Sequence, residues 1–244
     1  MPPFAHYRRK LAGLQAGPGT VIRWRVRKMR LTRGKLRLAM HLPPLLVIMA
    51  KAPVCGAVKT RLAKEIGDVH ATALNRALTA ALLREVASDA RFRTVLAISP
   101  DTAVGARFAA WRCRPAFPVS RAVQGRGDIG QRMQRIFGRC GSGPLIIVGT
   151  DIPFVKRGMI ATAFQRLRSA AAVLGPAEDG GYWLVGLRRR PKRLSPFSSV
   201  RWSTPHALAD TLNNLVPHRV TFAATLFDID SAADYRRYLC ERYA

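Results

Sequence analysis

Short, continuously apolar segments alternate with helical segments along residues 45–240, and this alternation constrains the fold more than any other feature of the sequence. Three of the apolar segments are LLVIMA at 45–50, TVLAIS at 94–99 and PLIIVGT at 144–150. They do not alternate with polar residues, as a strand with one face in water would. Because strands buried on both faces are typical of parallel sheets, we predict an α/β fold with a mostly parallel sheet and helices on both faces.

Charge divides the chain into a basic N-terminal arm and a body. Residues 1–41 contain eleven Lys and Arg residues and no acid, and the whole chain has a formal net charge of +27. We interpret residues 1–41 as an extension that is either disordered or the product of a misassigned start, and residues 42–244 as a single domain. The apolar segment after the arm is too short for a signal peptide or a membrane-spanning helix, so we expect a cytoplasmic protein without a transmembrane segment.

Cations follow the first predicted strand. The segment KAPVCGAVKTRL places Lys51, Lys59 and Arg61 in a loop that leads into a helix. In open α/β sheets, ligands bind where the carboxyl ends of strands lead into loops. Cations beside a helix N-terminus are typical of a phosphate site, and the alternative is a solvated basic loop.

Carboxylates follow the later strands. Asp151 comes directly after PLIIVGT, and Asp228 and Asp230 lie in FDID. Carboxylates near phosphate-binding cations suit Mg²⁺ or Mn²⁺, whereas the alternatives are helix N-caps or a solvated strand end. In GPAEDGGY, the two glycines allow a tight turn that presents Glu178 and Asp179 to a sugar hydroxyl, a metal or a proton.

The segment QGRGDIGQRM is a glycine-rich turn that enters a helix. Its backbone can approach a flat base or a sugar closely. The polar and glycine residues that we select from it are Gln124, Gly125, Asp128 and Arg132. Farther along the chain, Tyr182 either stacks on a sugar or base, or belongs to the core.

These segments occur in an order that resembles a bacterial family of GT-A-like glycosyltransferases in the nucleotide-diphospho-sugar transferase superfamily. The family is labelled DUF2064 or arsenosugar-biosynthesis-type glycosyltransferase. The resemblance covers residues 45–240 and rests on KAPVCGAVKTRL, QGRGDIGQRM, GTDIP, GPAEDGGYWLVGL, WSTP and DIDSAADY. It implies a Rossmann-like GT-A fold and kinship with small guanylyltransferases.

The resemblance also implies roles for individual residues. Nucleotide and phosphate binding falls to Lys51, Lys59, Arg61, Gln124, Gly125, Asp128 and Arg132. Metal binding, to Mg²⁺ or Mn²⁺, falls to Asp151 and Asp230. Asp179 is the expected base or orienting group, with Glu178 beside it. The expected acceptor or sugar contacts are Gly180, Gly181, Tyr182 and Trp202.

The chain departs from the family pattern at several of these segments. Family members usually have Pro at Cys55 and Arg at Ala57. They usually have acids at three further positions, which here are Arg126, Gln131 and Phe154. The loss of three acids bears on both the metal site and the acceptor contacts.

Three functions remain open at this point. The first is metal-assisted transfer of a sugar from a nucleotide-sugar to a small acceptor. The second is nucleotidyl transfer from a nucleoside triphosphate to a phosphorylated small molecule. The third is a basic nucleic-acid-binding protein on a degenerate transferase scaffold, although no sequence signature of specific nucleic-acid recognition is present. The nucleotide, the sugar, the acceptor and a homo-oligomeric state are left open.

Overall fold

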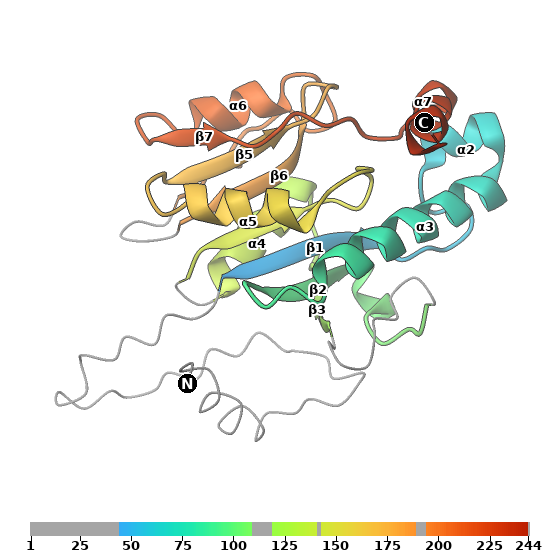
Figure 1. Ribbon diagram of the computed structural model, residues 1–244, viewed down its shortest axis with the longest axis horizontal. Helices are drawn as coiled ribbons and strands as arrows, with labels where there is room; N and C mark the ends of the chain where they lie inside the picture. Colours follow the sequence, from blue (N-terminus) through green and yellow to red (C-terminus); the bar gives the residue numbers. More distant parts are fainter. Residues whose placement is uncertain (1–43, 109–118, 141–142, 189–193, 244) are drawn as a thin grey trace.

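The computed structural model of the protein (Figure 1) describes residues 44–108, 119–140, 143–188 and 194–243. The basic arm at 1–41 lies outside the described residues, so our interpretation of it stays a prediction. No helix in the described ranges combines the length and the apolar character that crossing a membrane requires.

Seven strands in the described part of the chain form one sheet. They are β1 (Leu45–Lys51), β2 (Arg93–Ser99), β3 (Ser120–Val123), β4 (Leu145–Val148), β5 (Ala172–Pro176), β6 (Tyr182–Leu187) and β7 (Val220–Phe222). Their order is β3-β2-β1-β4-β6-β5-β7. Only β6 runs against its neighbours β4 and β5, and the other described pairs are parallel. This confirms the mostly parallel sheet.

Helices cover both faces of the sheet, as predicted. They are α2 (Thr60–Ile66), α3 (Asp68–Val86), α4 (Ile129–Arg139), α5 (Arg157–Arg166), α6 (Ala207–Asn213) and α7 (Ala232–Tyr243), with a short 3-10 helix η3 (Asp101–Ala103) after β2. Side chains of α3 and α5 share one apolar core, and those of α4 and α6 share the other. Figure 1 shows α3 and α5 along the same face of the sheet.

Alternate residues of each strand supply these two cores. On β1, Leu46 and Ile48 pack under α3 and α5, whereas Val47 packs under α4. All three side chains are fully buried. Both faces of the strand therefore need apolar residues, which explains the continuous apolar runs in the sequence.

A third, smaller cluster joins α2 and α3 to the C-terminal part of the chain. Leu62 of α2 and Tyr238 of α7 pack with Phe227 and Ile229. Figure 1 shows α7 beside α2 at one end of the sheet. This packing carries the segment 227–230 past the carboxyl end of β4, where Ile229 N donates a hydrogen bond to Asp151 O at 3.2 Å.

Candidate active site

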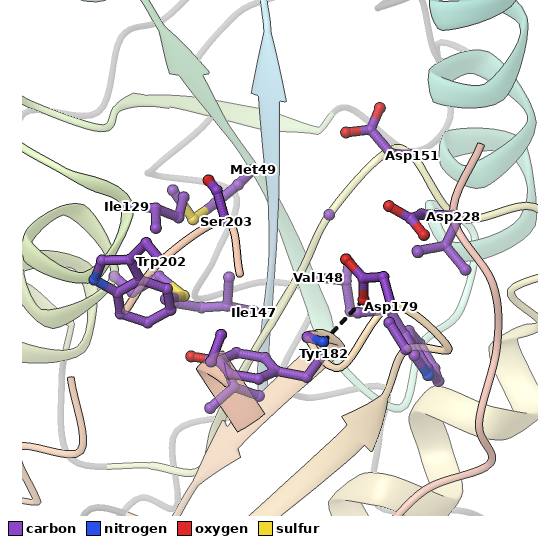
Figure 2. A pocket seen from close by; sticks show the side chains of 18 of the residues that line it. Met49, Ile129, Ile147, Val148, Asp151, Asp179, Tyr182, Trp202, Ser203 and Asp228 are labelled. Carbon is purple, nitrogen blue, oxygen red and sulfur yellow. Dashed lines mark hydrogen bonds between the residues drawn. The ribbon is translucent and has the colours of Figure 1, made fainter. Parts of the chain in front are cut away.

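A pocket of about 300 Å³ opens at the carboxyl ends of β1 and β4, beside the start of β6. Its volume falls at the lower end of the range that is usual for small-molecule sites. Figure 2 shows that its walls differ in chemistry: three carboxylates lie on one side and a mostly apolar wall on the other. The carboxylates are Asp151, Asp179 and Asp228, and the opposite wall includes Met49, Ile129, Met133, Ile147 and Trp202.

The turn before β6 fixes the position of Asp179. Asp179 Oδ1 accepts a hydrogen bond from Gly181 N at 2.8 Å. Gly180 has a φ of 85°, and a Cβ at this position would collide with the backbone of Pro205. Leu208 N of α6 donates to Gly180 O at 3.1 Å. Gly180 is therefore required for a close backbone contact that holds the turn, and with it Asp179, at the mouth of the pocket.

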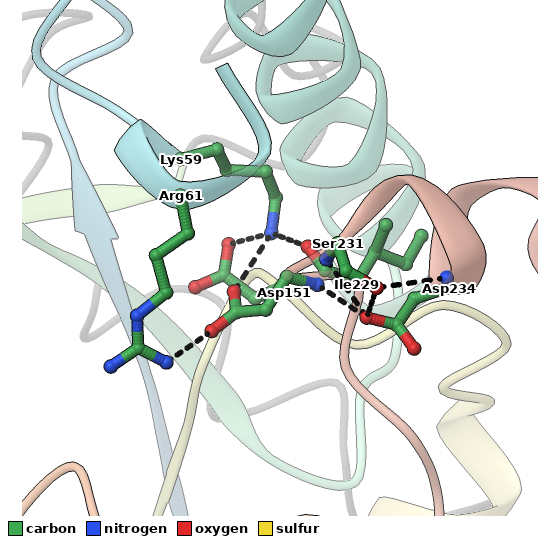
Figure 3. A network of polar contacts seen from close by, with 7 residues as sticks. Lys59, Arg61, Asp151, Ile229, Ser231 and Asp234 are labelled. Carbon is green, nitrogen blue, oxygen red and sulfur yellow. Dashed lines mark hydrogen bonds and ion pairs between the residues drawn. The ribbon is translucent and has the colours of Figure 1, made fainter. Parts of the chain in front are cut away.

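Lys59 lies at the centre of a second group of charges, next to the pocket (Figure 3). Its Nζ is 3.1 Å from Asp151 Oδ1 and 3.9 Å from Asp230 Oδ1. It also donates to Ile229 O at 2.7 Å. The Lys59 side chain is 2% exposed, so its ammonium group bridges β4 and the 228–230 segment within the fold. The phosphate-binding role of Lys59 stays a prediction, and the geometry adds a structural one.

Two of the acids carry raised pKa values. Burial, with the nearby charges of Asp179 and Asp230, raises the pKa of Asp228 from 3.8 to about 6. Burial also raises the pKa of Asp230, against the opposing effect of the Lys59 ammonium. Like charges and desolvation both disfavour the ionised form of a carboxyl. Grouping these acids at one edge of the sheet is therefore unfavourable for the stability of the fold. Such an accumulation is typical of functional sites.

Neither Asp151 nor Asp230 is a helix cap, which was the alternative interpretation of both. The N-cap residue of α5 is Lys156. At α7, Ser231 Oγ accepts a hydrogen bond from Asp234 N at 3.2 Å, so Ser231 is the residue that caps this helix. The carboxylates of Asp151 and Asp230 thus face Lys59 and the solvent, with half or nearly half of each side chain exposed.

Glu178 lies apart from the pocket. Its carboxylate accepts two hydrogen bonds from Arg237 of α7, at 2.6 and 3.1 Å. The Arg237 guanidinium in turn lies 3.9 Å from the ring centre of Phe227. Since Glu178 does not line the pocket and is held by Arg237, we do not include it in the proposed catalytic machinery.

The glycine-rich loop is held by hydrogen bonds to β1, β2 and η3 and by contacts within the segment itself. The buried Gln124 side chain donates to Ala50 O and Ala97 O at 3.1 and 2.9 Å, so it joins β1 to β2. Gly125, with a φ of 83°, donates its N–H to Asp101 Oδ1 at 2.9 Å. Asp128 caps α4. Arg132 Nε donates to Gly127 O at 2.7 Å. Their predicted contacts to a nucleotide remain predictions.

Lys51 and Arg61 lie outside the pocket but at the same edge. Lys51 is the exposed last residue of β1. The Arg61 side chain is 69% exposed, and its Nη1 pairs with Asp230 Oδ2 at 3.3 Å. Both cations are accessible to a phosphate that approaches the acid group from solvent.

The two predicted acceptor aromatics form one wall. Trp202 lies edge-on to Tyr182, with ring centres 6.2 Å apart, and also packs against Phe197. A Cβ on Gly130 would overlap the Trp202 indole, so α4 admits this ring only because residue 130 is glycine. The Tyr182 hydroxyl accepts a hydrogen bond from Thr211 Oγ1 at 3.4 Å, and burial raises the pKa of the phenol well above its usual range. Tyr182 is thus both a pocket residue and a core residue.

Two of the departures from the family pattern have structural roles here. Gln131 completes a capping box with Asp128 at the start of α4, a task that glutamine and glutamate share. Phe154 packs against Phe227 and Tyr238 in the cluster under α7. Arg126 is exposed in the glycine-rich loop.

Asp228 lines the pocket. The sequence analysis paired it with Asp230 as a candidate metal ligand, but the roles that the resemblance implied included Asp230 alone. The two acids flank Ile229, which is buried. The sequence analysis also did not identify the apolar wall of the pocket. Met49 lies near the end of the buried strand β1, and Ile129 and Met133 belong to the amphipathic helix α4, so nothing in the sequence distinguishes them from core residues.

Comparison with known proteins identifies the family. The model of the family DUF2064, described as an uncharacterized protein conserved in bacteria, matches residues 82–204. The chain belongs to this family. The matched part carries Asp151, Asp179 and Trp202, whereas Lys59 and the 228–230 segment lie outside it. No curated protein matches the chain.

Solved structures show the same fold. A protein from Desulfovibrio desulfuricans G20, described provisionally as a nucleotide-diphospho-sugar transferase, matches with a TM-score of 0.70 and 26% identity, over 77% of this chain and 82% of that chain. A 4-diphosphocytidyl-2C-methyl-D-erythritol synthase from Anaerococcus prevotii matches at 0.51 and 10%, over 84% and 97%. Rv0371c from Mycobacterium tuberculosis H37Rv matches at 0.50 and 17%, over 82% and 98%. The fold is that of the nucleotide-diphospho-sugar transferases, as predicted.

Proposed function

We propose that this DUF2064 protein is a transferase that moves a sugar from a nucleotide-diphosphate donor to a small acceptor held in the pocket. The observation that carries the proposal is the position of the acids. Asp179 and Asp228 line a pocket beside a charged group made of Lys59, Asp151 and Asp230. One site thus offers carboxylates for an acceptor and, next to them, groups for a diphosphate.

Asp179 is the proposed base. Its carboxylate is fixed at the pocket mouth by the glycine turn, so it can accept the proton of an acceptor hydroxyl without moving. Asp228, on the same side of the pocket, is the second group that can accept or orient that hydroxyl. The exposed Lys51 and Arg61 are the proposed partners of the departing diphosphate, because their positive charge offsets the charge that develops on it.

A divalent cation fits the donor set only in part. Among the described residues, no group of three or more His, Cys, Asp or Glu side chains is arranged to hold a metal ion. However, Mg²⁺ is usually held by one or two carboxylates together with substrate phosphates, and Asp151 and Asp230 are oxygen donors of this kind. We propose these two residues as the protein ligands of Mg²⁺ or Mn²⁺, which would supply further positive charge to the diphosphate. Lys59 already neutralises part of their charge in the described structure.

Nucleotidyl transfer is the second candidate. The accessible cations Lys51 and Arg61 suit a triphosphate as well as a diphosphate, and the acid pair suits the metal of either reaction. The two reactions differ in what leaves the donor: a nucleoside diphosphate in the first, pyrophosphate in the second.

The test is calorimetric titration of the full chain with UDP-, GDP- and ADP-sugars and with GTP and CTP, each with and without Mg²⁺ or Mn²⁺. Asp151→Asn is the matched variant, because it removes the charge and keeps the shape of the side chain. We expect one nucleotide-sugar to bind in a metal-dependent manner and to lose affinity in the variant. Binding of a triphosphate alone would favour nucleotidyl transfer, and binding that Asp151→Asn leaves unchanged would contradict the proposed metal site.

A further inference from the structure

The pocket has a charge opposite to that of the chain that surrounds it. The protein contains 41 Lys and Arg residues and only 14 Asp and Glu. Of the described residues that line the pocket, none is Lys or Arg, and three are Asp. A site that binds an anion usually places Arg, Lys or a set of N–H donors toward it. Although the chain is rich in cations, no Lys or Arg of the described ranges lines the pocket.

Two of the neighbouring cations, Lys59 and Arg61, pair with acids outside the pocket's apolar wall. The Lys59 side chain is 2% exposed, and its ammonium contacts Ile229 O and Asp151 Oδ1. Arg61 pairs with Asp230 and points along the outside of the acid group (Figure 3). Neither residue lines the pocket. The acid side of the pocket therefore presents carboxylate oxygens, which accept hydrogen bonds and attract positive charge.

The opposite wall is apolar and held in place by packing. Trp202 is packed against α4 at Gly130 and against the rings of Tyr182 and Phe197. Ile129 and Met49 continue this wall in Figure 2. An indole and flexible thioethers offer a surface to a ring or a short hydrocarbon body. The pocket is thus amphipathic from one side to the other.

We propose that the pocket selects an acceptor that is uncharged or cationic, with hydroxyl or amine donors at one end and an apolar body of about the size of one ring at the other. Phosphorylated and other anionic acceptors are rejected by Asp179 and Asp228. That the bound molecule is the acceptor of a transfer reaction rests on the proposed function. The selectivity of binding follows from the residues of the pocket alone. It also disfavours nucleotidyl transfer to a phosphorylated molecule, since a phosphate inside the pocket would face Asp179 and Asp228 with no Lys or Arg among the described lining residues.

The experiment uses three probes that share one ring and one linker: 2-phenylethanol, 2-phenylethylamine and 2-phenylethyl phosphate. Each is titrated into the full chain without a donor, with binding followed by ligand-observed NMR. Trp202→Ala separates pocket binding from attraction to the basic surface, and Trp202→Phe keeps an aromatic wall in case the alanine variant is poorly folded. We expect the alcohol and the amine to bind, to lose about tenfold in affinity in Trp202→Ala and to recover most of it in Trp202→Phe.

The phosphate probe decides the charge selectivity. We expect no binding of 2-phenylethyl phosphate that depends on Trp202, and we expect such binding to emerge when Asp179→Asn and Asp228→Asn are combined. Binding of the phosphate probe that depends on Trp202 and is as tight as that of the alcohol overturns the inference, as does the lack of Trp202-dependent binding for all three probes. The separate nucleotide-sugar titration distinguishes the two proposals: selective probe binding without any donor binding would refute the transfer reaction and leave the pocket selectivity in place.

Discussion

Replacing Asp228 with Asn should stabilise the protein at neutral pH, because the native fold makes this carboxyl hard to ionise. Burial and the charges of Asp179 and Asp230 raise its pKa from 3.8 to about 6. A shift of about two units corresponds to ~3 kcal/mol. Because Asp228 is only half-buried, solvent screening reduces the expected gain to about 1.5 kcal/mol.

The sign of the effect depends on pH. The native pKa of Asp228 lies above the unfolded value, so the stability of the wild-type protein falls as the pH rises from about 4 to beyond 6. Asn cannot ionise and avoids this loss. The gain should therefore be complete at pH 7.5 and shrink to about a third of its size at pH 4.5, where the native carboxyl is mostly protonated.

The assay is urea unfolding of both proteins at pH 4.5 and 7.5, with EDTA to remove bound metal. Asp210→Asn is an opposite-sign control. Two hydrogen bonds from the Arg201 guanidinium hold the pKa of the Asp210 carboxyl below its usual range, so the control should lose stability at pH 7.5. A gain in Asp228→Asn that does not change between the two pH values would refute the reasoning, as would a loss at pH 7.5.

Three further predictions concern the site. Gly180→Ala should lower the free energy of unfolding by about 3 kcal/mol in a urea titration, since the new Cβ meets both the positive φ and the backbone of Pro205. Lys59→Met should cost about 1–3 kcal/mol in the same titration, because it leaves Asp151 and Asp230 without their shared cation; an unchanged stability would contradict this. Once a donor is known, Asp179→Asn should lower kcat by about 10²-fold or more, whereas Glu178→Gln should leave it nearly unchanged; a larger loss in Glu178→Gln would return that residue to the catalytic group.

The fold class could be predicted from the sequence because strands that are buried on both faces have a simple, continuously apolar pattern. A central strand such as β1 has to fill a core on each side, so its apolar run is continuous and its type can be predicted. The edge at which ligands bind follows from the same topology, and it brought Asp151, Asp179 and Asp230 near one another as expected.

The partners of individual side chains could not be predicted in the same way. Glu178 and Asp179 are adjacent in sequence, yet one pairs with Arg237 of the last helix and the other lines the pocket. Lys59 follows from its motif as a cation near phosphate, but its burial between two acids depends on contacts with residues about 90 and 170 positions away. Such long-range contacts leave no local pattern in the sequence.

The antiparallel direction of β6 restricts which pocket residues can be substituted to change ligand selectivity. Because β6 starts at the ligand edge, Tyr182 and Trp183 are at once pocket residues and the first residues of a central strand. The Trp183 indole also donates to Ala224 O at 2.9 Å. Substitutions of Tyr182 or Trp183 that change the shape of the pocket therefore also disturb the packing of the core. Ser203 and Thr204 also line the pocket, but they are exposed and belong to no strand, so new selectivity can evolve there at the least cost in stability.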